Sequence, residues 1–215
     1  MKKIPIVIAI DGPSASGKGT LAKKLATHFH IPFLSTGAIY RLVALRLIKQ
    51  KIDPKNFEVN IQKLAANITE SDLDNDELFT EEVGSVTSSI AKNQKLREEL
   101  FYFQKKFVED GKLAMGAVLD GRDTTTVICP DADFKFFVTA DVEVRARRRF
   151  EQLKQKVGDV VYEDILSQLK LRDENDFNRS DSPLKIASDA IVIDNSQLSI
   201  EQGFYKILQE IETKK

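Results

Sequence analysis

Residues 5–20 read PIVIAIDGPSASGKGT. The opening run PIVIAI is apolar and rich in Ile, which is typical of a strand buried on both faces of a sheet. Gly, Pro and Ser then interrupt the apolar pattern. Leu21, Leu25 and Phe29 follow at four-residue spacing, which predicts the apolar face of a helix. The stretch therefore predicts a buried strand, a glycine-rich turn and a helix.

The turn has the spacing G-x4-G-K, which ends at Lys18. Backbone N–H groups converge on phosphate oxygens where the dihedrals are permissive, and a following helix adds its N-terminal dipole. A Lys at this position can reach the β- and γ-phosphates of a nucleotide. We predict a phosphate-binding loop formed by Gly12, Pro13, Ser14, Ala15, Ser16, Gly17, Lys18, Gly19 and Thr20. A glycine-rich turn without a ligand is the alternative.

The metal ligands of such a loop stay open in this sequence. Gly19 stands where a Ser or Thr usually contacts Mg²⁺ directly, and the hydroxyl of Thr20 follows one position later. Water-mediated binding of Mg²⁺ is therefore an alternative to direct coordination by a hydroxyl.

The composition limits the class of protein. The chain has 215 residues, of which 42% are hydrophobic and 30% are charged, and its net charge is -1. These values are typical of one globular domain and argue against a globally basic nucleic-acid binder. A single cysteine, Cys129, excludes an intramolecular disulfide framework. The apolar runs are shorter than the roughly 18 residues of a membrane-spanning helix, so we expect a soluble, cytoplasmic protein with no membrane partner.

The rest of the chain continues the alternation of strands and helices. We expect helices at 38–50 and 199–212, a polar helical segment at 51–113, and a charged segment at 141–182. Further strands are predicted at four short apolar runs: 32–34, 117–119, 134–138 and 190–193. Strands separated by helices indicate an α/β fold, here a five-stranded parallel sheet with helices on both faces.

The string IAIDGPSASGKGT resembles bacterial cytidylate kinases, within the nucleoside monophosphate kinases of the P-loop class. The resemblance extends over essentially the whole chain through the motifs TGAIYR (36–41), LDGRD (119–123), RDENDFNR (172–179), Pro183-Leu184 and LSIEQ (198–202). It implies a three-layer P-loop NTPase fold built as a single kinase domain. The core would comprise about 1–50, 114–144 and 183–215, with an NMP-binding insert at about 51–113 and a mobile lid at about 145–182.

The same resemblance implies ATP-dependent phosphorylation of CMP and dCMP, in pyrimidine nucleotide metabolism, by a monomer that uses Mg²⁺. It implies catalytic roles for Lys18, Arg122, Arg172 and Arg179. It implies that the loop and Arg148 bind the donor ATP, with Arg145 and Arg149 nearby at the start of the lid. The acceptor site would contain Thr36, Arg41, Ser88, Arg97, Arg122, Asp123, Arg172, Asp176 and Arg179. Of these, Ser88, Arg97 and Asp123 would read the cytosine edge, and Asp176 would lie near the ribose.

Elementary electrostatics supports several arginines in such a site. Donor and acceptor phosphates must come into contact, so bidentate cations are needed to offset their repulsion. As an alternative, Arg172 and Arg179 pair with Asp173 and Asp176 as solvated helix charges. A departure from the family pattern also stands at Thr125, where a glycine is expected. The remaining functional alternatives are a P-loop kinase of another small acceptor (UMP, AMP or shikimate) and an ATP-dependent switch without phosphoryl transfer.

Overall fold

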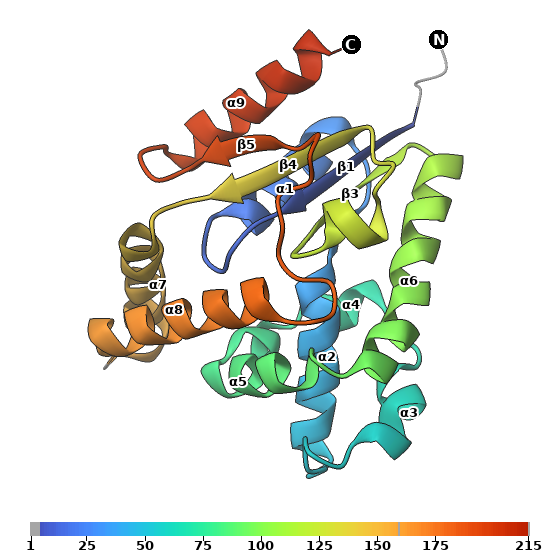
Figure 1. Ribbon diagram of the computed structural model, residues 1–215, viewed down its shortest axis with the longest axis vertical. Coiled ribbons are helices and arrows are strands. Elements are labelled where there is room, and N and C mark those ends of the chain that lie inside the picture. Colours follow the sequence, from blue (N-terminus) through green and yellow to red (C-terminus); the bar gives the residue numbers. More distant parts are fainter. Residues whose placement is uncertain (1–4, 159, 215) are drawn as a thin grey trace. The chain divides into compact units, whose positions relative to one another are not determined.

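The computed structural model describes residues 5–158 and 160–214 (Figure 1). These residues divide into two compact units. The first, which we call the sheet unit, comprises Met1–Leu34 and Gly111–Lys215, and the second, the helical unit, comprises Ser35–Asp110.

Within the described residues the strands form one five-stranded sheet in the order β2-β3-β1-β4-β5. Strand β1 pairs in parallel with β3 and β4, and β4 pairs in parallel with β5. The bounds are Ile6–Asp11 for β1, Phe33–Ser35 for β2, Gly116–Gly121 for β3, Phe134–Thr139 for β4 and Ile191–Asp194 for β5. All five strands predicted from the sequence are therefore confirmed, and β1 lies at the centre of the sheet.

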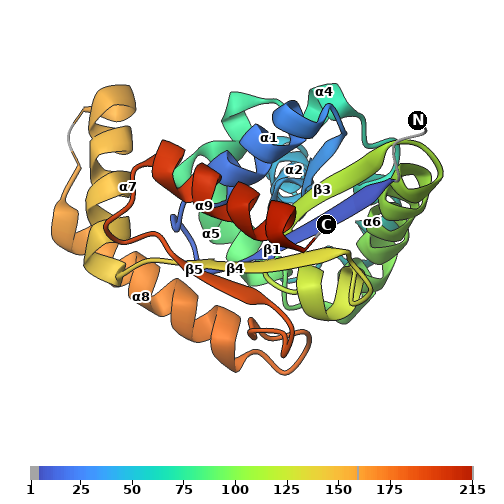
Figure 2. The ribbon, with the colours of Figure 1, turned by 90° about the horizontal axis from the view of Figure 1, so that it is seen from above.

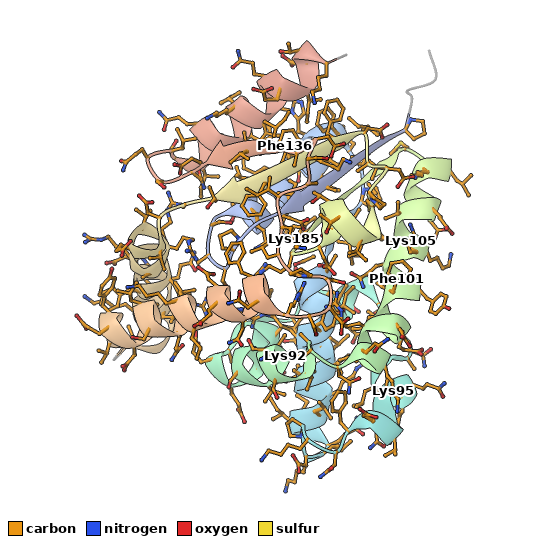
Figure 3. The ribbon with its side chains drawn as sticks, viewed as in Figure 1. Lys92, Lys95, Phe101, Lys105, Phe136 and Lys185 are labelled. Carbon is orange, nitrogen blue, oxygen red and sulfur yellow. The ribbon has the colours of Figure 1, made fainter. Side chains whose placement is uncertain are left out.

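Helices α1 (Lys18–Phe29) and α9 (Ile200–Thr213) lie side by side on one face of the sheet (Figure 2). Alternate residues of β1 point toward them, because successive side chains of a strand face opposite sides. The core on this face is formed by Ile6, Ile8, Ile10, Leu21, Leu25, Val118, Phe136, Val138, Ile193, Phe204, Ile207 and Ile211. Phe136, on β4, is fully buried there (Figure 3).

The opposite face of the sheet is covered by a π-helical turn and by the end of a long helix. The turn, η3 (Thr124–Ile128), contacts β1 and β3, and Cys129 just after it is fully buried. Near the end of α6 (Gln94–Leu113), a Cβ on Gly111 would lie 2.7 Å from the Cβ of Ala117. Only a glycine lets the helix approach β3 so closely. The predicted α/β fold with helices on both faces is thereby confirmed.

The charged segment between β4 and β5 forms a pair of helices, α7 (Val142–Val157) and α8 (Tyr162–Asn178). Four buried side chains join them: Ala146, Leu153, Ile165 and Leu169. This cluster is separate from the core under α1 and α9. The pair therefore forms a subassembly with its own small core.

The helical unit is built around α2 (Thr36–Lys49), which packs against α5 (Glu81–Ile90). Short helices connect the two: η1 (Glu58–Asn60), α3 (Ile61–Ala65), α4 (Glu70–Leu73) and η2 (Asp76–Phe79). Residues 51–113 are all described, and they contain helices and turns but no strand, as predicted. Within residues 5–158 and 160–214, no helix combines the length and the apolar character that crossing a bilayer requires.

Candidate active site

The candidate site lies at the carboxyl ends of the central strands. The predicted phosphate-binding loop follows β1, and Asp120 to Asp123 lie at and just beyond the end of β3. Because β1 and β3 are parallel neighbours with Asp11 opposite Gly121, both segments leave the same edge of the sheet. Ligands of open α/β sheets bind at this edge.

The backbone of the loop has the unusual dihedrals that its composition predicts. Gly12 has φ 153° and Gly17 has φ 91°, and Ala15 also has a positive φ of 60°. A Cβ on Gly12 would lie only 2.0 Å from the carbonyl oxygen of Val138. The close approach to β4 therefore requires glycine at position 12, and Gly17 supplies the left-handed N-cap of α1.

Three donors satisfy carbonyl oxygens of the loop. Lys18 Nζ donates to the Pro13 oxygen at 3.1 Å, Arg145 Nη1 to the Ser14 oxygen at 3.1 Å, and Asn195 Nδ2 to the Ser16 oxygen at 2.9 Å. In a planar trans peptide the N–H points opposite to the C=O. The N–H groups of the following residues, Ser14, Ala15 and Gly17, are therefore directed away from these donors. Backbone N–H groups that are not turned toward these cations and amides can serve an anion.

Lys18 is a buried cation with further cations close by; its exposed fraction is 7%. Burial, together with the positive charges of Arg122 and Arg172, lowers the pKa of the Lys18 ammonium to about 7, against the opposing effect of Asp120. A buried lysine with a strongly shifted pKa beside two arginines is typical of a functional site. The negative charge of a bound polyphosphate would favour the protonated form of Lys18.

Two of the predicted arginines lie beside carboxylates. Arg122 Nε donates to Asp176 Oδ2 at 2.6 Å, and Arg179 Nη2 lies 3.9 Å from Asp123 Oδ2. Burial raises the pKa of Asp176, but the charges of Arg122, Arg172 and Arg179 more than offset this effect, so the pKa is lowered overall. The site therefore brings together Lys18, Arg122, Asp123, Arg172, Asp176 and Arg179, all six within the sheet unit.

The pairing differs from the helix-surface alternative considered above. Asp173 Oδ2 accepts a hydrogen bond from Arg145 Nη2 at 2.6 Å, and Asp176 pairs with Arg122. These two carboxylates of α8 are thus engaged by arginines of other elements. The ion pair with Arg145 connects α8 to the same guanidinium that holds the Ser14 carbonyl. Helix α8 and the predicted phosphate-binding loop are therefore linked through the side chain of Arg145.

Arg148 makes contacts of a different kind. Its Nη2 donates to the backbone oxygens of Asn195 at 2.7 Å and Leu198 at 3.3 Å, in the loop between β5 and α9. Asn195, which touches both Arg148 and the phosphate loop, was not identified from the sequence. A single Asn after a strand carries no motif, so only its position in the fold reveals it.

The other four predicted site residues lie in the helical unit. Arg41 Nη1 donates to the Leu78 oxygen at 2.7 Å, and its Nη2 would lie 3.5 Å from a Cβ on Gly84. Ser88, one turn further along α5, donates to the Gly84 oxygen. The Arg97 guanidinium lies 6.0 Å from the ring centroid of Tyr40, the neighbour of Arg41. The fourth residue, Thr36, is buried at the start of α2.

Comparisons with known proteins assign the chain to a family. The family model described as cytidylate kinase matches residues 8–213. A cytidylate kinase from Bartonella henselae is 46% identical over 203 residues, which cover 93% of this chain and 91% of that protein. One from Bradyrhizobium sp. is 44% identical, with 96% of each chain covered.

A solved structure, an uncharacterized protein from Eubacterium ventriosum, has a similar fold. Its TM-score is 0.57 at 18% identity, and the match covers 96% of this chain and 98% of that one. The fold likeness agrees with the sequence matches, which reach well above 30% identity over nearly the full length. The chain belongs to the cytidylate kinase family.

Proposed function

We propose that this chain transfers the γ-phosphoryl group of ATP to CMP and dCMP, forming ADP and CDP or dCDP. The observation that carries the proposal is Lys18, buried beside Arg122 and Arg172 at the mouth of the phosphate loop. Two phosphorylated substrates in contact repel each other, and these three cations would offset that negative charge. Membership of the cytidylate kinase family supports the choice of ATP as donor and of a cytidine nucleotide as acceptor.

On the donor side, we assign the phosphates of ATP to residues 12–20. The backbone N–H groups of the loop and the N-terminus of α1 would bind the phosphate oxygens, and Lys18 would stabilise the charge on the transferring group. Arg148 would contribute from the start of α7 through its hold on the loop after β5.

The residues beside the loop fit a bound Mg²⁺. A Cβ on Gly19 would lie 3.5 Å from Asp120 Oδ2, so a carboxylate oxygen lies beside the loop. Across the described chain no three His, Cys, Asp or Glu side chains are grouped to hold a metal by themselves. Mg²⁺ in nucleotide sites is held by one or two carboxylates together with water and phosphate oxygens. We propose Asp120 as that carboxylate; when bound, the ion would offset charge on the donor phosphates.

On the acceptor side, we propose that four arginines offset the charge of the acceptor phosphate and of the transition state: Arg41, Arg122, Arg172 and Arg179. Thr36 would also contact the acceptor nucleotide. Ser88, Arg97 and Asp123 would recognise cytosine, and Asp176 would bind the ribose. No side chain is needed as general base, because the second pKa of a phosphate monoester is about 6 and the attacking oxygen is already ionised.

The domain assignments belong to the same proposal. Residues 51–113 would act as the NMP-binding insert and 145–182 as a lid that closes over ATP, because an open site would allow water to compete with CMP. The link from Arg145 to both Asp173 and Ser14 supports coupling of that lid to the loop. We further propose that the protein acts as a monomer in the cytoplasm, without a nucleic-acid or membrane partner.

The test is acceptor-dependent release of ADP from MgATP with CMP, dCMP, UMP, AMP, GMP and shikimate. We expect turnover with CMP and dCMP well above that with the others. A preference for another acceptor would leave a kinase but overturn the cytosine assignment of Ser88, Arg97 and Asp123. ATP binding without ADP release for any acceptor would favour a nucleotide-dependent switch instead.

A further inference from the structure

Asn195 joins three parts of the sheet unit at the end of β5. Its exposed fraction is 3%. Its backbone N–H donates to the Thr139 oxygen at 2.8 Å, which fixes it beside the end of β4. Its side-chain Nδ2 donates to the Ser16 oxygen at 2.9 Å, and its backbone oxygen accepts a hydrogen bond from Arg148 Nη2 at 2.7 Å. The residue therefore contacts the sheet, the phosphate loop and α7 at once.

The orientation of the Asn195 amide follows from chemistry and from space. Only the NH₂ group can donate to a carbonyl, so Nδ2 must face Ser16. The amide lies between two glycines: a Cβ on Gly17 would lie 2.7 Å from Nδ2, and a Cβ on Gly203 of α9 would lie 3.0 Å from Oδ1. Any side chain at either position would displace the amide. Asn195 Oδ1 is buried and has no hydrogen-bond partner among the described residues.

The hydrogen bond to Ser16 determines the direction of one N–H group of the loop. Ser16 contributes the C=O, and Gly17 the N–H, of the same planar trans peptide, in which the two bonds point opposite ways. With the carbonyl held by Asn195, the Gly17 N–H points away from Asn195. Gly17 has a positive φ of 91°, and the flexibility of glycine would allow this peptide to rotate if it were not held.

We propose that Asn195 is a positioning residue for the donor phosphates: it holds the Ser16–Gly17 peptide so that the Gly17 N–H faces the nucleoside triphosphate, and through Arg148 it connects α7 to the same peptide. The inference rests on the proposed function and adds to it a residue outside the loop motif. A preorganised N–H donor stabilises phosphate without reorganising during the reaction.

The first test compares two substitutions at this position. Asn195→Asp keeps the shape but places a carboxylate oxygen against the Ser16 oxygen, and Asn195→Ala removes the donor. From the usual contribution of one hydrogen bond we expect the Kd for MgATP to rise about 3- to 10-fold in Asn195→Ala, and by more in Asn195→Asp, where repulsion is added. The KM for ATP should rise in parallel, whereas the KM for CMP should change less than about twofold.

Ser196→Ala is the matched control. Ser196 lies next in the same loop, where its hydroxyl donates to Asp194 and accepts a hydrogen bond from the Asp141 N–H, and these partners lie outside residues 12–20. This variant removes hydrogen bonds near the end of β5 but leaves the hydrogen bond from Asn195 to Ser16 in place. We expect thermal stability to fall while the Kd for MgATP stays within about twofold of wild type.

A second route displaces the amide without changing it. In Gly203→Ala the new Cβ would press on Asn195 Oδ1, although alanine is the better helix former. We expect the Kd for MgATP to rise about two- to threefold in the wild-type background, and not at all in the Asn195→Ala background, where the amide that the new Cβ would displace is absent. If Gly203 and Asn195 each served only the fold, the effects of the two substitutions on the Kd would be independent and would add.

The proposal is overturned if both Asn195 variants, folded as judged by their thermal transitions, bind MgATP as tightly as wild type. It is also overturned if the KM for CMP rises as much as the KM for ATP, or if the effects of Asn195→Ala and Gly203→Ala simply add. Calorimetric binding of MgATP needs no acceptor. A failure of the proposed phosphoryl transfer would therefore show in the acceptor assay while the role of Asn195 is still decided by binding.

Discussion

Asp11 Oδ2 accepts two hydrogen bonds from Thr125, one from the N–H at 2.7 Å and one from the hydroxyl at 2.6 Å. The other carboxylate oxygen accepts the N–H of Thr124 at 2.9 Å. Asp11 is completely buried at the end of β1, directly before the phosphate loop. Burial raises the pKa of Asp11, and these hydrogen bonds oppose the rise. The carboxylate thus anchors the π-helical turn that follows Arg122 and Asp123.

The Thr125 hydroxyl is a feature that the family resemblance did not lead us to expect, because a glycine was anticipated there. Thr125→Val keeps the volume and the backbone N–H but leaves the buried carboxylate with one donor fewer. We expect the free energy of unfolding to fall by about 1–3 kcal/mol. Urea denaturation measures it, with Thr125→Ser close to wild type because the hydroxyl is retained.

Thr126→Val provides the matched control for that prediction. The Thr126 hydroxyl lies 3.5 Å from the Asp123 backbone oxygen, a long and weak contact. Its removal should change stability much less than the loss of the Thr125 hydroxyl. Equal stabilities for Thr125→Val and wild type would show that the turn does not depend on this bond.

Because Asp176 pairs with Arg122, we expect the free energy of unfolding to depend on Asp176 and to change at acidic pH. Each side chain is 17% exposed, and Asp176→Asn would leave Arg122 without its carboxylate. We expect a loss of about 2–3 kcal/mol near neutral pH, somewhat less than for a fully buried pair, because the site is partly solvated. Asp110→Asn, which breaks an exposed pair with Lys106, is the control and should lose far less.

The sign of the pH effect follows from the lowered pKa of Asp176. Above the ordinary value of 3.8 the carboxylate is charged in both the folded and the unfolded state, and its contribution to stability is complete. As the pH falls below 3.8 toward the folded-state pKa, the folded state must also take up the proton and the contribution is lost. The difference in stability between wild type and Asp176→Asn should therefore shrink below about pH 4. A difference that is constant with pH would contradict this account.

Much of the fold could be predicted because its signals are local. The apolar run before Gly12, the glycines of the loop and the four-residue spacing of Leu21, Leu25 and Phe29 each depend on neighbouring residues only. The helical content of 51–113 was predicted in the same way, from a polar segment without alternation. These elements formed as the patterns indicated.

The contacts that complete the site could not be predicted, because they join distant parts of the chain. Asp11 binds residues more than 110 positions later, and Asn195 binds Ser16 across 179 positions. The alternative considered from the sequence paired Arg172 and Arg179 with Asp173 and Asp176, because these residues are close together in one helical segment. Tertiary packing instead directs Asp173 to Arg145 and Asp176 to Arg122.

Lys18 is predicted to be essential for transfer. Lys18→Ala removes the cation from the phosphate loop, and we expect kcat to fall by about 100-fold or more. Lys23→Ala, an exposed lysine on the same helix, should leave kcat near wild type. The thermal transition of Lys18→Ala should persist, since the removed charge is buried at a cost. Near-wild-type turnover of this variant would refute the assignment of the loop.

The lowered pKa of Lys18 predicts proton uptake when ATP binds. In the free protein the pKa is about 7, so at pH 8 the side chain is mostly neutral. The donor phosphates favour the charged form, so binding should take up about half a proton at pH 7 and nearly one at pH 8. Calorimetry in buffers of different ionisation enthalpy measures this uptake. Lys18→Arg, which stays charged, should lack it, and equal uptake by the two proteins would assign the proton elsewhere.

Substitution of Arg179, which follows α8 directly, tests whether this arginine acts in phosphoryl transfer or only in the fold. Its Nε donates to the Ser182 oxygen at 2.6 Å, and its side chain is 10% exposed, near Asp123. In Arg179→Ala we expect kcat with CMP to fall by about 10-fold or more, because a cation that acts on the transition state is lost. Amide hydrogen exchange in 162–182 should become faster, since the contact that holds the segment is removed. Arg179→Lys keeps the charge without the planar fork, so it should recover only part of the rate. Unchanged kinetics in Arg179→Ala would mean that this arginine serves the fold alone.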